Sequence, residues 1–77
     1  MVKVLLFAQF QEAAGRESVD VDAAGQPVGH VKSILKENYG LLDLDNATVA
    51  VNQEYTDMDT ELKEGDTVAF IPPVSGG

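Results

Sequence analysis

The sequence predicts an α+β domain in which one sheet of four to five strands is crossed by a single main helix. Two patterns predict this class: several short segments alternate apolar and polar residues with the period of a strand, and one longer segment repeats apolar residues at helical spacing. The 77 residues fit one small domain, and 44% of them are hydrophobic, which is enough to build a core. The expected order of elements is ββαβ(β)β.

Alternation and turn residues give the strand boundaries. Residues 11–15 are expected to form a loop that ends in a glycine turn, so that the first two strands make a hairpin, and residues 41–47 are expected to form a second loop. The last strand stops at Pro72, because proline has no N–H to donate to the ladder. The predicted strands are residues 1–10, 18–22, 48–52 and 67–71, with a brief edge strand at 55–60.

The helix is predicted between two residues that favour its ends. Pro27 suits the first turn, and Gly40 suits the left-handed position that follows the last turn. Between them the apolar side chains that recur at helical spacing are those of Val28, Val31, Leu35 and Tyr39.

One helix can cover only one face of the sheet. Period two then divides the strand residues into a covered set and an uncovered set. An uncovered apolar face is typical of a partner surface, although the chain's own loops could cover it instead. The covered set is Val2, Val4, Leu6, Val49, Val51, Val68 and Phe70, and the uncovered set includes Leu5, Phe7, Ala69 and Ile71.

Composition argues against several classes of function. Thirteen acidic residues against five basic ones give a net charge of −8, which disfavours binding to nucleic acid or to anionic membranes. The chain has no cysteine, which excludes a disulfide scaffold, a thiolate zinc site and an iron–sulfur cluster and fits a cytoplasmic protein. Its longest apolar run, residues 4–8, is too short for a signal peptide or a membrane span. We expect no bound metal or cofactor.

The last six residues are expected to form a tail beyond a domain of residues 1–71. Prolines extend a chain, and glycines carry no side chain. A tail of this length could reach roughly 20 Å and could enter a channel too narrow for any Cβ. The tail comprises Pro72, Pro73, Val74, Ser75, Gly76 and Gly77.

A tail that ends in a free carboxylate has one evident chemical use. Transfer of an adenylyl group from ATP would turn the carboxylate into a mixed anhydride, and sulfide equivalents could convert that anhydride into a thiocarboxylate. The chain contains no GxxxxGK[ST] phosphate loop that could bind ATP. The activating enzyme is therefore expected to be another protein.

Three stretches resemble the small subunit of molybdopterin synthase: residues 2–9 (VKVLLFAQ), residues 49–53 (VAVNQ) and residues 65–77 (GDTVAFIPPVSGG). The resemblance covers the whole chain, and its ending is the most specific part. It implies a ubiquitin-like β-grasp fold with a mixed sheet. Many members of the family carry Arg where this chain has Gln11, which affects a polar partner contact but not the tail chemistry.

The resemblance also implies function and partners. Gly77 would be adenylated by a ubiquitin-activating-like adenylyltransferase, thiocarboxylated with sulfur from a sulfur-donating enzyme, and inserted with Gly76 into a large synthase subunit. There the sulfur would convert cyclic pyranopterin monophosphate into molybdopterin. The chain would thus be no enzyme on its own but part of a hetero-oligomer. The implied partner-binding residues are Phe7, Tyr55, Ile71, Pro72, Pro73, Val74 and Ser75.

The sequence leaves two other functions open. A sulfur carrier of the thiamine pathway also ends in Gly-Gly, although the Pro-Pro-Val-Ser approach favours the molybdopterin reading. A ubiquitin-like interaction or conjugation module would have the same fold without the sulfur chemistry. A metal or acid–base role for His30, the only histidine, would need converging partners and is not expected, and Ser75 has no nearby base that would make it a nucleophile.

Overall fold

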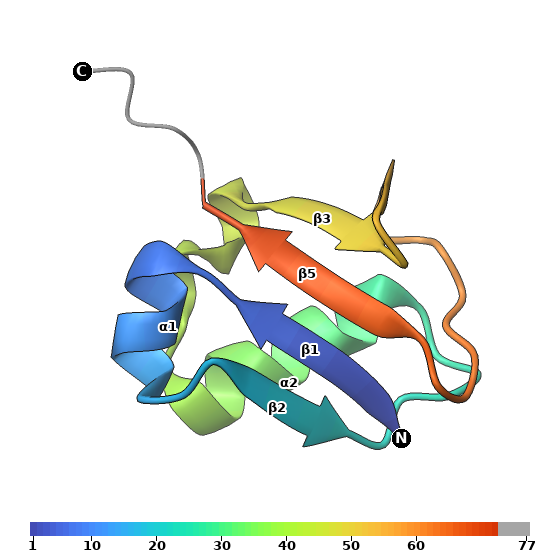
Figure 1. Ribbon diagram of the computed structural model, residues 1–77, viewed down its shortest axis with the longest axis horizontal. Coiled ribbons are helices and arrows are strands. Elements are labelled where there is room, and N and C mark those ends of the chain that lie inside the picture. The colour runs from blue at the N-terminus through green and yellow to red at the C-terminus, as the bar shows by residue number, and fades with distance from the viewer. Residues whose placement is uncertain (73–77) are drawn as a thin grey trace.

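The computed structural model describes residues 1–72, except for the side chains of Leu42 and Asp43. A five-stranded sheet is crossed on one face by the long helix α2 (Figure 1). The elements in chain order are β1 (Val2–Leu6), α1 (Ala8–Ala14), β2 (Ser18–Val21), α2 (Val28–Tyr39), the 3₁₀ helix η1 (Leu42–Asn46), β3 (Thr48–Val51), β4 (Glu54–Thr56) and β5 (Thr67–Ile71).

The sheet has the order β2-β1-β5-β3-β4, so the last strand of the sequence lies in its centre. β5 runs parallel to β1, with Lys3 opposite Thr67 and Leu6 opposite Phe70, and antiparallel to β3. The predicted mixed sheet of four to five strands is therefore confirmed, and the topology is that of a ubiquitin-like β-grasp domain.

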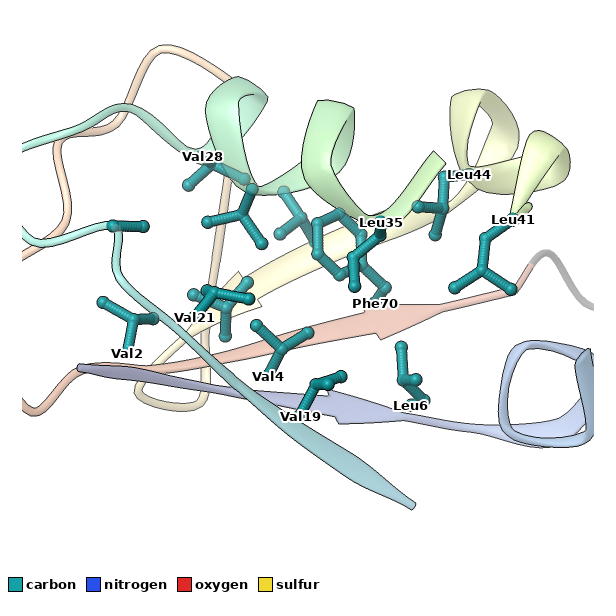
Figure 2. Close-up of a cluster of buried hydrophobic side chains, with 14 of the residues drawn as sticks. Val2, Val4, Leu6, Val19, Val21, Val28, Leu35, Leu41, Leu44 and Phe70 are labelled. Carbon is teal, nitrogen blue, oxygen red and sulfur yellow. The ribbon is translucent and has the colours of Figure 1, made fainter. Parts of the chain in front are cut away.

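The predicted helix is confirmed as α2. Pro27 precedes its first residue, and Gly40 ends it in the left-handed conformation, at φ 67°. Val28, Val31 and Leu35 are fully buried against the sheet, as Figure 2 shows for Val28 and Leu35. The first two N–H groups of α2 donate to backbone carbonyls of the segment between β4 and β5: Val28 N to Thr60 O and Gly29 N to Met58 O, both at 2.9 Å. These bonds satisfy groups that a helix leaves unpaired at its start.

The face of the sheet beneath α2 holds the core, as the alternation predicted. The strand residues predicted for this face are buried, except that Val51 is partly buried against the core. Phe70 of β5 lies near the middle of this layer (Figure 2). We call this side the inner face and the opposite side the outer face.

The prediction for residues 7–15 was wrong, because the first strand ends at Leu6 and a helix replaces the expected loop. Ala8 adopts a left-handed conformation, φ 49°, which turns the chain out of the strand direction. The helix α1 then brings Phe10 into the core, where it is 2% exposed, and ends at Gly15 with φ 76°. The first two strands do pair antiparallel, but α1 connects them where a tight hairpin loop was expected.

Two smaller predictions also need correction. Residues 42–46 form η1 where a loop was expected, and η1 is tied to α2 by Asp45, whose carboxylate accepts from Lys32 at 2.6 Å and from Lys36 at 3.0 Å. The edge strand β4 covers residues 54–56 and ends earlier than predicted. Its chain leaves the sheet because residues 58 and 60 pair with the start of α2.

Candidate functional site

The outer face has small side chains in its middle and large ones around them. In the strand register Tyr55 lies opposite Ala50, Ala50 opposite Ala69, and Ala69 opposite Leu5. Residues opposite one another on neighbouring strands point to the same side of the sheet. Two adjacent alanines therefore form a low floor between bulkier neighbours, and the sheet is hollowed at that point.

This hollow, which we call the outer hollow, has a volume of about 560 Å³. Two aromatic side chains on its border are exposed: Phe7 by 42% and Tyr55 by 77%. Large apolar side chains left in solvent around a concave surface are characteristic of a protein-binding site. The residues that line the hollow are Leu5, Phe7, Ala50, Asn52, Gln53, Tyr55, Thr67, Ala69 and Ile71.

Three of the predicted partner-binding residues lie together here. Phe7 follows β1, Ile71 ends β5, and Tyr55 comes from the edge strand β4. Pro72, directly after β5, is half-buried. The other predicted site residues, Pro73, Val74, Ser75, Gly76 and Gly77, lie outside the described residues.

The alternation also placed Leu5 and Ala69 on this face, whereas sequence reasoning gave no such position to Ala50, Asn52, Gln53 or Thr67. Ala50 sits between two valines that face the core, so the alternation could have assigned it to the outer face. Asn52 was predicted as the last residue of a strand, which ends at Val51 instead, and Gln53 as part of the reversal that follows it. They form the two-residue turn between β3 and β4, and both line the hollow. Thr67 was placed in the correct strand but without a role.

Charge is scarce on the outer face of this acidic protein. Among the outward-pointing strand residues of the described chain, the charged ones are Lys3 and Asp20, which lie opposite one another on β1 and β2. The remaining outward positions are alanine, serine, threonine, leucine, isoleucine and tyrosine. An apolar partner could thus cover the hollow without burying an unpaired charge, which would be costly.

One end of the hollow is fixed by a hydrogen-bond network. Asn52 Oδ1 accepts from Thr67 N at 3.1 Å, and Asn52 Nδ2 donates to Asp66 Oδ1 at 3.0 Å. The other oxygen of Asp66 accepts from Lys63 N at 2.8 Å. The hydrogen bond from Asn52, aided by that from Lys63, lowers the pKa of the Asp66 carboxyl below its usual value. The carboxylate is therefore kept as an acceptor that holds the turn in place.

Other candidate sites find little support in the described part of the chain. His30 is exposed in the first turn of α2. Among the side chains that the structure describes, no group of three or more His, Cys, Asp or Glu is arranged to hold a metal ion. Among the helices described, none is long and apolar enough to cross a membrane.

Comparison with known proteins gives consistent matches over the whole chain. A model of the ThiS family matches residues 4–77. The molybdopterin synthase sulfur carrier subunit of Escherichia coli strain K12 is 37% identical, with both chains covered completely.

Two solved structures have the same fold. In a protein–protein complex of subunits 1 and 2 of molybdopterin-converting factor from Helicobacter pylori, one chain is 31% identical, with a TM-score of 0.73 over 99% of this chain and 97% of that one. Small archaeal modifier protein 1 from Methanosarcina acetivorans is 28% identical, with a TM-score of 0.84 over 99% and 95% of the two chains.

Proposed function

The chain belongs to the ThiS family and is a sulfur carrier of molybdenum cofactor biosynthesis, and we propose that it carries the sulfur as a thiocarboxylate on Gly77. The observation that carries this proposal is the family match, which continues through residue 77. A second supporting observation is the outer hollow, an apolar surface that includes Ile71, the last residue before the proline pair. By itself the chain is not an enzyme in this scheme but the sulfur-donor subunit of molybdopterin synthase.

The chemistry begins with activation of the Gly77 carboxylate. Its oxygen attacks the α-phosphorus of ATP on a ubiquitin-activating-like adenylyltransferase, which forms the acyl-adenylate and releases pyrophosphate. A sulfide equivalent from a sulfur-donating enzyme then attacks the carbonyl carbon. The C–S bond forms, the C–O bond to AMP breaks, and AMP leaves. The product is a thiocarboxylate, a soft nucleophile. The cycle uses ATP of the partner enzyme, and we propose that it takes place in the cytoplasm.

Sulfur delivery needs a second partner, which we propose is the large subunit of molybdopterin synthase. The Helicobacter pylori relative was solved as a complex of subunits 1 and 2, which supports an assembly of this kind. The outer hollow, with Phe7, Tyr55 and Ile71, is the docking surface in this proposal. The residues from Pro72 to Ser75 bridge this surface and the terminal glycines, which enter the large subunit's pocket.

The test is an intact-mass measurement after incubation with the activating enzyme, ATP and sulfide. The expected result is the mass gain of one oxygen replaced by sulfur, on the full chain only. Deletion of Gly77 is expected to abolish the gain and to leave the melting temperature unchanged. Because oxidation of Met1 or Met58 gives nearly the same gain, the product is alkylated with iodoacetamide, which modifies the thiocarboxylate but not a sulfoxide. A full chain that stays unalkylated would overturn the proposal.

The similarity to small archaeal modifier protein 1 supports a second candidate, in which the activated Gly77 is joined to lysine side chains of other proteins. An extension of the same incubation separates the two candidate functions. Addition of sulfide and the pterin precursor with the large subunit yields molybdopterin only for a sulfur carrier, whereas conjugation would give larger covalent adducts that survive alkylation.

A further inference from the structure

Of the three residues other than glycine that have a left-handed backbone in the described chain, two line the outer hollow and the third directly follows a lining residue. Within the described chain they are Ala8 (φ 49°), Asn52 (φ 52°) and Gln53 (φ 72°). Ala8 directly follows Phe7, and the other two line the hollow themselves. Such conformations are unfavourable for residues with a Cβ, and they tend to concentrate at functional sites. A left-handed backbone at each of these positions therefore needs a structural or a functional explanation.

The conformation of Asn52 has an internal explanation. A two-residue turn between antiparallel strands needs positive φ at both central residues, and asparagine is favoured at the first of them. Its side chain is also bonded on both sides, to Thr67 N and Asp66. Its own N–H donates to Thr67 O at 2.8 Å. Asn52 is thus the residue that this turn requires.

Gln53 has no comparable explanation. It occupies the second central position, where glycine is the preferred residue. Its side chain is exposed and makes no hydrogen bond to any other residue of the described chain, in contrast to that of Asn52. The side chain does, however, stand at the border of the hollow, beside the apolar floor that Ala50 and Ala69 form.

We propose that Gln53 is a specificity-determining residue for the large synthase subunit, and that its amide pairs with a backbone N–H or C=O of the segment docked in the outer hollow. This inference rests on the proposed function. An amide both donates and accepts, so it can satisfy a peptide group that the apolar floor leaves unpaired. A partner whose docked segment is misaligned would leave the Gln53 amide or its own peptide group buried without a hydrogen bond. The cost of that unpaired group would discriminate between partners.

The experiment uses the full chain and the large subunit of the same synthase, and measures the dissociation constant and the melting temperature of each variant. Gln53→Met keeps the length and the backbone but removes the amide, so it is expected to weaken binding about 5–10-fold without a change in melting temperature. Gln53→Gly is expected to weaken binding equally while raising the melting temperature by about 2–6 °C, because the backbone strain is relieved.

Ala8→Gly is the matched control, since it relieves the same kind of strain at a residue whose side chain does not line the hollow. It is expected to raise the melting temperature and to leave binding within about twofold. The inference is overturned if Gln53→Met binds as tightly as the unchanged chain, or if Ala8→Gly weakens binding as much as Gln53→Gly does. Absence of any complex with the unchanged chain would overturn the proposed function, and this inference with it.

Discussion

Phe70 lies on β5 and Phe7 directly follows β1, the parallel neighbour of β5. The two side chains face opposite sides of the sheet because Phe70 pairs with Leu6, one residue before Phe7. Phe70 is completely buried on the inner face, whereas Phe7 is 42% exposed on the outer face. The inner face is filled by large aliphatic side chains and α2, and the outer face has alanines in its centre. One sheet thus separates the part of the molecule that provides stability from the part that can bind.

The largest contrast is expected from truncating the two phenylalanines. Phe70→Ala should lower the free energy of unfolding by about 3–5 kcal/mol, because it leaves a cavity in the core. Native domains of this size are stable by only about 4–12 kcal/mol, so the variant will be close to unfolding. Phe7→Ala removes the same atoms and should cost about 1 kcal/mol or less. Urea unfolding measures both.

Binding should show the reverse order for any variant that stays folded. Phe7→Ala is expected to weaken the complex with the large subunit about tenfold or more, because exposed aromatic side chains often dominate an interface. If Phe7→Ala instead lost as much stability as Phe70→Ala, Phe7 would belong to the core, and the distinction between the faces would fail.

The next largest effect is expected from filling the hollow. Ala69→Leu adds a branched side chain to the floor and should weaken the complex with the large subunit about 10–100-fold, with a small change in melting temperature. Ala13→Leu is the control, because Ala13 is exposed on α1 and does not line the hollow. Calorimetric titration gives both affinities. If Ala69→Leu bound the large subunit as tightly as the unchanged chain does, the partner would not use the floor of the hollow.

The smallest effect is expected at Asp45, an exposed residue of η1 that pairs with α2 and does not line the outer hollow. Hydrogen bonds from Lys32 and Lys36 lower the pKa of the Asp45 carboxyl. A carboxyl with a lowered pKa in the folded state adds stability above its unfolded pKa of about 3.9, and this is lost as the pH falls through the folded value. Asp45→Asn should therefore lower the melting temperature at pH 7, and the difference from the unchanged chain should shrink below about pH 4.

This prediction needs a control for net charge. Glu37→Gln removes the same charge from an exposed position on α2, and Glu37 takes no part in the ion pairs of Asp45 with Lys32 and Lys36. If the difference caused by Asp45→Asn stayed constant from pH 7 to pH 3, the ion pairs would not hold η1 to α2. Partner binding should be unaffected in either variant, which keeps this test separate from those on the outer face.

Much of the fold could be predicted from local patterns. The alternation in residues 67–71 gave the bounds of β5, and Pro27 with Gly40 bracketed α2. The helix α1 was missed because its start depends on a left-handed alanine, which has no sequence signature, and because no capping side chain or acidic first turn marks it.

The candidate site could be predicted only in part. Phe7, Tyr55 and Ile71 were identified from the resemblance, and Phe7 and Ile71 also from the alternation. The hollow itself depends on Ala50 and Ala69 being opposite one another. That register involves strands separated by many residues, and no local pattern determines it. Gln53 escaped notice because its unusual conformation is visible only in the folded backbone.

The central position of β5 has a consequence for how the protein matures. β1 and β3 are each paired with β5 and not with each other, so the sheet is two separate parts until this last strand is inserted. Pairings between residues as distant as 3 and 67 form slowly, because the intervening chain must first be brought together. Ala69, which lies on β5, supplies half of the floor of the hollow, and Ala50 is held beside it by the pairing of β3 with β5. A partner that recognises the hollow will consequently ignore half-formed chains and select molecules in which folding is complete.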